Sequence, residues 1–166
     1  MKYGASALLC MLLVGGCSKS PDSASPEGAV LIYEKACQEN DMDAVIAAKD
    51  FVTEARLMSE DMHKHLNHVQ IDADFITNTA RQNERSFRDY WYRKGFPKLN
   101  GDFAFPMREA VEDGLVVVTE VFTSRSGEVV TQKILVSKTA QGWRVVHPIR
   151  ENEQNQPPQP TPPKGG

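Results

Sequence analysis

The sequence predicts an α+β fold in which N-terminal helices pack on one face of a C-terminal antiparallel sheet. Apolar residues recur at helical spacing as far as about Arg93, which is typical of amphipathic helices. After Gly95 the apolar runs are short, rich in β-branched residues and separated by turn residues, which is typical of consecutive strands. Helices followed by a strand meander indicate the α+β class.

The first two helices are predicted from their capping residues. In Ser25-Pro26-Glu27 a hydroxyl precedes a proline and an acidic residue, an arrangement that favours a helix start. The apolar positions then continue to about Glu39. Asn40-Asp41 interrupts the pattern, and Asp41 can cap a second helix, whose apolar positions are Ala44, Val45, Ala48 and Phe51.

Two longer helices are expected next. The third spans Glu54 to Val69, with a predicted core stripe of Met58, Met62, Leu66 and Val69. The fourth spans about Asp74 to Arg93, with an apolar face of Ile76, Ala80, Phe87, Tyr90 and Trp91. Both assignments depend on the 3.6-residue period of an amphipathic helix.

The strands follow in sequence order. They are expected at Met107 to Glu112, Leu115 to Thr123, Val129 to Lys138 and Trp143 to His147. The segments 124–127 and 139–142 contain Ser, Thr and Gly, which favour turns between antiparallel strands.

The N-terminus indicates export. Lys2 precedes an almost purely apolar run, Ala5 to Val14, which is too short for a bilayer core that needs roughly twenty helical residues. Such a run typically belongs to a signal peptide. Its end, Leu13-Val14-Gly15-Gly16-Cys17, resembles the lipobox of bacterial lipoproteins. The resemblance implies cleavage after residue 16 and lipidation of Cys17, and Ser18 implies outer-membrane sorting, with the inner membrane as the alternative.

The predicted organisation therefore has four parts. Residues 1–16 form the signal peptide, 17–25 a lipidated tether and 26–150 one domain. The last segment, 151–166, holds five prolines and no large apolar side chain. We expect it to be disordered, because it cannot bury enough surface to offset the entropy of ordering.

Charge disfavours nucleic-acid binding, and the cysteine positions predict a lone buried thiol. The formal net charge of −3 provides no broad positive field, so nucleic acid is not expected as a partner. Cys10 lies in the signal peptide and Cys17 is the lipidation site, so Cys37 would be the lone thiol of the mature chain. Cys37 lies on an apolar helical stripe, and we expect it to be a buried packing residue.

The order of elements also resembles a known superfamily. A short capped helix, the Asn40-Asp41 break, a second helix and a meander that ends in Gly142-Trp143-Arg144-Val145 resemble the NTF2-like superfamily. More narrowly, they are similar to small bacterial lipoproteins of unknown function, over about Pro26 to Pro148. The resemblance implies a cone-like fold with a pocket between sheet and helices. Enzymes, ligand carriers and interaction modules all occur on this fold.

A histidine cluster is the first candidate site. His63, His65 and His68 lie within six residues, and imidazole is a good ligand for zinc or copper. If the helix continued, Asp61, His65, His68 and Asp72 would share one face. Four ligands on a straight helix span about 16 Å, so a metal site would need a ligand from elsewhere. The alternative is an exposed polar stripe.

An arginine stripe is the second candidate. Arg81, Arg85 and Arg88 share a helical face, with Tyr92 on the same side. Such a stripe could bind lipid phosphates or an acidic partner, or it could be a solvated face that includes a Glu84–Arg88 pair.

Glu120 is the candidate catalytic base. It alternates with Val116, Val118 and Phe122, and burial of that face would raise its pKa. The other face, with Leu115, Val117, Thr119 and Val121, is equally eligible for the core. His147 could supply an acid partner at the end of the last strand, although nothing in the sequence joins it to Glu120.

The function predicted from the sequence is binding rather than catalysis. We expect a protein anchored by lipid to the periplasmic face of the outer membrane, whose domain binds a protein partner or a small apolar ligand. No cofactor and no enzymatic activity are expected, since nucleophile-elbow, phosphate-loop and metalloprotease motifs are absent from the sequence. The alternatives are metal handling by the His63–His68 cluster and, third, a small-molecule enzyme with Glu120 as base.

Overall fold

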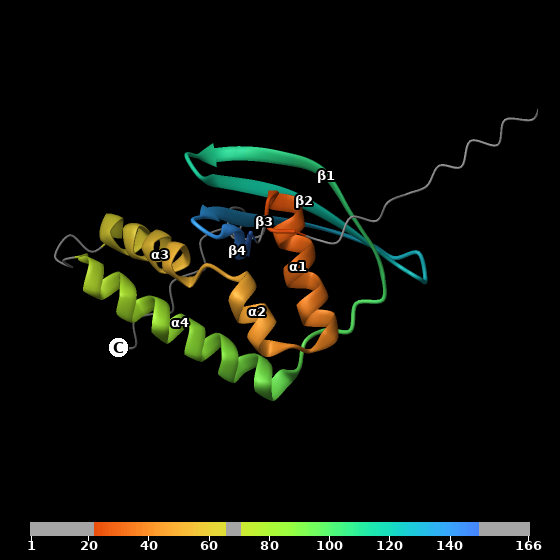
Figure 1. Ribbon diagram of the computed structural model, residues 1–166, viewed down its shortest axis with the longest axis horizontal. Helices are drawn as coiled ribbons and strands as arrows, with labels where there is room; N and C mark the ends of the chain where they lie inside the picture. The colour runs from red at the N-terminus through yellow and green to blue at the C-terminus, as the bar shows by residue number, and fades with distance from the viewer. Residues whose placement is uncertain (1–21, 66–70, 150–166) are drawn as a thin grey trace, which may run out of the picture.

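In the part of the chain that the structure describes, four helices precede a four-stranded antiparallel sheet (Figure 1), so the α+β prediction is confirmed. The computed structural model describes residues 22–65 and 71–149. Cys17, His68 and segment 151–166 lie outside these ranges, as does the side chain of His65. The elements are α1 (Pro26–Glu39), α2 (Met42–Ala48), α3 (Phe51–His65), α4 (Ala73–Lys94), β1 (Gly101–Glu112), β2 (Leu115–Ser124), β3 (Val129–Thr139) and β4 (Gly142–Ile149).

The predicted caps begin the first two helices. The Ser25 hydroxyl accepts a hydrogen bond from the Gly28 N–H at 3.0 Å, and the Asp41 carboxylate accepts one from the Ala44 N–H at 3.0 Å. Asn40 ends α1 in the left-handed conformation, with φ +55°. These bonds satisfy backbone groups that a helix end leaves unpaired.

The sheet has the strand order β1-β2-β3-β4. β1 begins at Gly101, six residues before the predicted start at Met107. The pairing of β1 with β2 is irregular between Ala104 and Met107, where the chain passes through Pro106. Proline lacks an N–H, but an edge strand tolerates it at a bulge. The proline breaks the run of strand-forming residues, so the sequence pattern indicates only the second half of β1.

Both faces of the sheet contribute to the core. On one face Val30 of α1 packs against a cluster formed by Val118, Ile134, Val136 and Val145. On the other face Leu57 of α3 packs against Leu115, Val117, Leu135 and Val146. Alternate side chains of a strand point to opposite faces, so α1 covers one face and α3 reaches the other.

The buried face of α3 differs from the prediction. Met58 and Met62 are 48% and 39% exposed, and the buried residues of this helix are Phe51, Ala55 and Ser59. Phe51 and Ala55 form a cluster with Ala80 of α4. Small residues at i+4 spacing allow two helices to approach closely. The predicted methionine stripe is therefore not the buried face of α3, and the prediction is wrong as far as the structure describes it.

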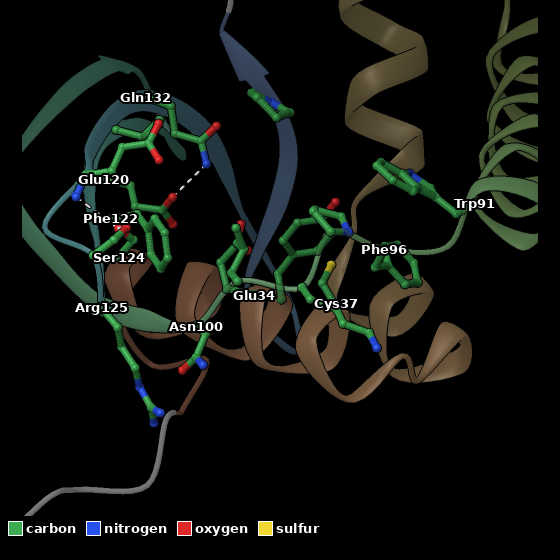
Figure 2. Close-up of a pocket in the computed structure, with 18 residues that line it drawn as sticks. Glu34, Cys37, Trp91, Phe96, Asn100, Glu120, Phe122, Ser124, Arg125 and Gln132 are labelled. Atoms are coloured by element: carbon green, nitrogen blue, oxygen red, sulfur yellow. Dashed lines mark hydrogen bonds between the residues drawn. The ribbon is translucent and has the colours of Figure 1, made fainter.

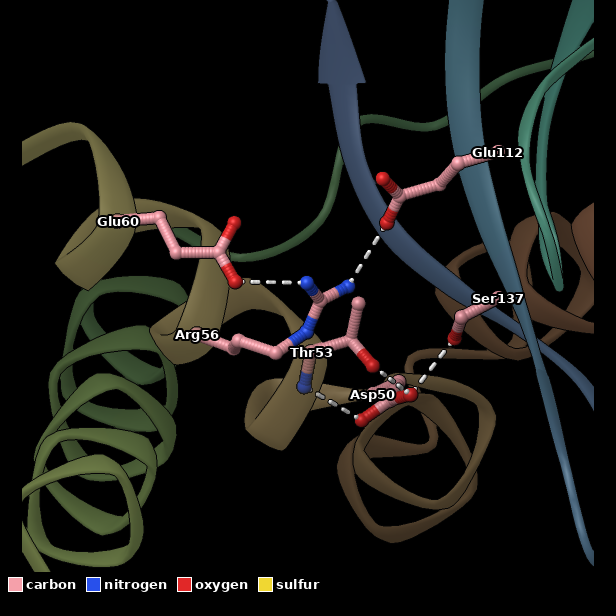
Figure 3. A network of polar contacts seen from close by, with 6 residues as sticks. All are labelled: Asp50, Thr53, Arg56, Glu60, Glu112 and Ser137. Atoms are coloured by element: carbon pink, nitrogen blue, oxygen red, sulfur yellow. Dashed lines mark hydrogen bonds and ion pairs between the residues drawn. The ribbon is translucent and has the colours of Figure 1, made fainter. Parts of the chain in front are cut away.

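Polar contacts fasten the start of α3 to the sheet (Figure 3). The Asp50 carboxylate accepts hydrogen bonds from the Thr53 N–H at 3.0 Å and from the Ser137 hydroxyl at 2.6 Å. Arg56 contacts Glu60 at 2.8 Å and Glu112 at 3.1 Å. These contacts hold α3 against strands β1 and β3.

A buried lysine lies beside this junction. Lys49 is 5% exposed, donates to the Val146 carbonyl and lies 3.5 Å from Glu54. Its neighbour Asp50 donates its N–H to the Val145 carbonyl at 2.8 Å. The α2–α3 connection therefore runs along the free edge of β4. Over the described ranges, the helices are too short or too polar to cross a bilayer.

Candidate functional site

A pocket of about 760 Å³ opens between α1, the α4–β1 connection and the face of the sheet that α1 covers (Figure 2). Aromatic rings supply much of its wall, namely Tyr33, Trp91, Phe96 and Phe122. Lys98, Asn100, Arg125, Ser126 and Glu128 line it from exposed positions, and we call this part the mouth. The volume is in the range of small-molecule sites.

The end of α4 places two of these rings. The helix stops at Gly95, whose φ of +69° suits glycine. The Gly95 N–H donates to the Trp91 carbonyl at 2.7 Å, and the chain then turns back. Phe96 consequently stacks on Trp91, with ring centroids 5.0 Å apart and planes 25° apart. The two rings form one flat apolar wall.

Glu120 lies at the floor of the pocket. It is 1% exposed, and its Oε1 accepts a hydrogen bond at 2.6 Å from Gln132, its register partner on β3. Burial raises the pKa of Glu120, although the hydrogen bond from Gln132 opposes this. The orientation that the sequence left open is thereby resolved, because Glu120 shares the α1-covered face with Val118.

Glu34 is the site residue that the sequence analysis missed. It is 6% exposed and lines the same pocket from α1. Burial, followed by the charge of Glu120, raises the pKa of Glu34 to about 8. Its spacing from Val30 and Cys37, four and three residues, places all three on one helix face. This spacing is the signal that could have identified it.

Cys37 has the packing role that its sequence position predicts. It is 6% exposed, and burial raises its pKa to about 12. Burial also raises the pKa of the neighbouring Tyr33. Both groups therefore stay protonated at neutral pH, and a protonated thiol is a poor nucleophile.

The structure does not bring His147 together with Glu120. His147 is paired in register with Leu135, which in turn pairs with Val117. Cross-strand partners lie on the same face, and Val117 is three residues from Glu120. The two side chains therefore lie on opposite faces of the sheet, and the suggested catalytic pair is wrong.

The helix face suggested for Asp61, His65, His68 and Asp72 does not extend to Asp72, and His68 lies outside the described residues. α3 is described as far as His65, and Asp72 caps α4 by accepting from the Phe75 N–H at 2.7 Å. His63 is exposed on α3. Within 22–65 and 71–149, no three metal-ligating side chains are grouped in a way that could hold an ion. Asp61 and Asp72 therefore do not lie on one helix face.

The arginine stripe is partly neutralised. Arg88 contacts Asp43 of α2 at 2.8 Å and Glu84 at 3.5 Å. Arg81 and Arg85 are exposed, and Tyr92 is 86% exposed. Arg88 thus joins α4 to α2, and its pair with Glu84 is the one that the alternative interpretation, a solvated face, predicted.

Comparison with known proteins adds one likeness. No family model matches the sequence, and no curated protein matches it. Among solved structures, the chain is similar to a Campylobacter jejuni protein described as a candidate NTF2-like transpeptidase, with 13% identity and a TM-score of 0.39. The match covers 74% of this chain and 97% of that one. The transpeptidase description belongs to that protein.

Proposed function

We propose that this protein is a lipid-anchored envelope protein whose domain binds a small, mainly apolar molecule without transforming it. The observation that carries the proposal is the pocket of about 760 Å³ between sheet and helices, with its aromatic wall. Such a concave, mostly apolar space with a few converging polar groups is typical of ligand sites.

Ligand binding is tested by native mass spectrometry of the mature protein extracted from the membrane fraction with detergent, with a pocket-blocking variant beside it. Val130 lines the pocket from β3 and is 48% exposed, while its neighbour Val129 is 60% exposed. Successive strand residues point to opposite faces. Val130→Trp should abolish a bound mass, whereas the matched control Val129→Trp should retain it.

The outcomes separate three functions. A bound organic mass that Val130→Trp removes supports the proposal. A bound metal mass would favour the alternative at the His63–His68 cluster. Ligand-free protein in every preparation would contradict the carrier role and favour a protein partner instead.

The second candidate is an enzyme with Glu120 as general base, which the burial of Glu120 in the pocket and its raised pKa favour. Recovery of the bound compound after prolonged incubation distinguishes the two. A carrier returns its ligand with unchanged mass, and a changed mass that depends on Glu120 would overturn the non-catalytic proposal.

The lipid anchor is proposed from the sequence, because Leu13–Cys17 resembles a lipobox. We propose attachment to the periplasmic face of the outer membrane. Cys17→Ser should move the protein from the membrane pellet to the soluble fraction, since diacylglycerol is the attachment. Cys37→Ser is the matched control and should leave the protein in the pellet. Retention of the Cys17→Ser variant in the pellet would contradict the anchor.

A further inference from the structure

The floor of the pocket combines two carboxyl groups from separate elements. Glu34 projects from α1 and Glu120 from β2 toward the same space (Figure 2). Their exposed fractions are 6% and 1%. The charge of Glu120 acts on Glu34 strongly enough to raise the pKa of Glu34, so the two groups are electrostatic neighbours.

One buried carboxyl oxygen of this pair is unpaired within the described residues. Oε1 of Glu120 accepts a hydrogen bond from Gln132, whereas Oε2 of Glu120 has no hydrogen-bond partner among the residues that the structure describes. Native proteins rarely leave a buried polar atom unsatisfied, because the desolvation of such a group costs about 1–3 kcal/mol. An unsatisfied carboxyl oxygen at the floor of a pocket indicates a missing hydrogen-bond donor.

Protein cations do not neutralise the pair. In the described ranges, no ion pair joins Glu34 or Glu120 to a basic side chain. Lys49, the buried lysine, is paired with Glu54, and Lys98 and Arg125 are exposed at the mouth. The floor is therefore acidic, while the wall beside it is aromatic.

We propose that Glu34 and Glu120 bind the ammonium group of a small amine whose apolar body lies against the aromatic wall. An ammonium has three donors and no acceptor, so it can satisfy Oε2 of Glu120 and the Glu34 carboxyl together. Aromatic faces such as those of Tyr33 and Phe122 also attract cations. The inference rests on the proposed function, since it names the chemical class of the pocket ligand.

Proton binding should oppose amine binding. Burial and the neighbouring carboxyl raise the pKa of Glu34 to about 8, so below that pH Glu34 holds a proton that a cation must displace. The other titratable groups of the pocket are Tyr33 and Cys37 on α1, Lys98 and Arg125 at the mouth, and Glu128 in the β2–β3 turn. Tyr33 and Cys37 remain neutral because their pKa values are raised. Amine affinity should therefore increase as the pH rises from about 6 to 8.5.

The test compares three probes that share one apolar body: naphthylmethylamine, naphthylmethanol and naphthoic acid. Isothermal titration of the full chain gives the dissociation constant of each. The dissociation constant of the amine should be lower than that of the alcohol by a factor of about ten or more, as expected for charge-assisted hydrogen bonds. The affinity of the amine should increase with pH, and the affinity of the alcohol should not depend on pH.

Variants test whether Glu34 and Glu120, at the floor of the pocket, cause the preference for the amine over the alcohol. Glu120→Gln should reduce amine binding to the level of the alcohol while the alcohol still binds, which shows that the pocket remains folded. Glu34→Gln should have the same effect, and Glu128→Gln at the mouth should preserve the preference.

An amine that binds no better than the alcohol would overturn the inference and leave the proposed function intact. Tightest binding of the acid would also overturn it and would assign recognition to Lys98 and Arg125. Failure of all three probes would count against the binding pocket itself.

Discussion

Asp50 joins three parts of the chain through one carboxylate. It caps α3 through the N–H groups of Val52 and Thr53 and accepts the hydroxyls of Thr53 and Ser137. Burial raises the pKa of Asp50, but the hydrogen bonds, led by that from Ser137, outweigh burial and hold it below the usual 3.8. A single residue thus couples helix initiation to attachment of that helix to the sheet.

The lowered pKa of Asp50 gives a prediction about acid stability. A carboxyl whose folded pKa lies below its unfolded value contributes stability above the unfolded pKa and loses it as the pH falls through the folded one. Asp50→Asn should therefore lower the free energy of unfolding by about 1–3 kcal/mol at neutral pH. The difference from the parent should shrink below about pH 4, as urea titrations at both pH values would show.

The matched control for this prediction is Asp61→Asn, on the exposed part of α3. It should change stability little at either pH. A deficit of Asp50→Asn that is equal at neutral and acidic pH would contradict the role of the ionised carboxylate.

The two pocket carboxyls show how far single residues could be predicted. The strand pattern identified Glu120 but left its orientation open, because valines occupy both faces of β2 and both faces are covered. Glu34 was missed because a charged residue within a helix is usually solvated. Its burial depends on the sheet that α1 meets much later in the sequence, and local spacing does not contain that contact.

Among the elements, β4 begins at a glycine that combines a positive φ with a close steric approach. Gly142 has φ +112°, and a Cβ there would lie 2.5 Å from the Ser23 hydroxyl oxygen and 2.6 Å from the Ser23 carbonyl oxygen. Gly127, in the β2–β3 turn, has φ +86° with no atom within 4 Å of such a Cβ. Gly127 therefore has only the backbone requirement for glycine, whereas Gly142 has both the backbone requirement and a steric one.

Alanine at these two positions should have different effects. Gly127→Ala should cost about 1–2 kcal/mol from backbone strain alone. Gly142→Ala should cost at least about 1 kcal/mol more, because overpacking against Ser23 adds to the strain. Thermal or urea unfolding of both variants measures the difference. Equal losses would show that the contact with Ser23 contributes nothing to stability.

Element boundaries were predicted best where the signal is local. Ser25 and Asp41 act through hydrogen bonds within three residues, so the starts of α1 and α2 follow from sequence. The first half of β1 was not predicted because Pro106 interrupts the strand pattern. Proline is tolerated at this position because β1 is an edge strand. The prediction of the buried face of α3 was wrong because the packing of α4 against α3, rather than side-chain size, determines which residues are buried.

At the scale of the whole molecule, the acidic pocket floor should lower stability at neutral pH. The pKa of Glu34 is raised from 4.5 to about 8. A carboxyl with a raised folded pKa contributes stability that is complete below the unfolded value and is lost as the pH rises toward the folded one. The free energy of unfolding should therefore fall between about pH 4.5 and pH 8.

The corresponding variant is Glu34→Gln. Glutamine cannot ionise, so this decline should largely disappear, and the variant should be more stable than the parent at pH 8 by about 1–3 kcal/mol. Urea titration across this pH range gives the slope for both proteins. A variant that retains the parent slope would show that Glu34 ionises normally in the folded chain.

The contact of Ser23 with β4 determines which way the pocket would open on a cell envelope. The Trp143 N–H donates to the Ser23 carbonyl at 2.8 Å, so with a lipid on Cys17, the six residues to Ser23 would reach at most about 20 Å. The β3–β4 end of the sheet would then stay near the bilayer surface. The mouth at Arg125 lies beyond the other end of β3, and a strand of 11 residues spans about 35 Å. With the proposed anchor in place, the mouth of the pocket would lie at the end of the sheet that is farther from the tether.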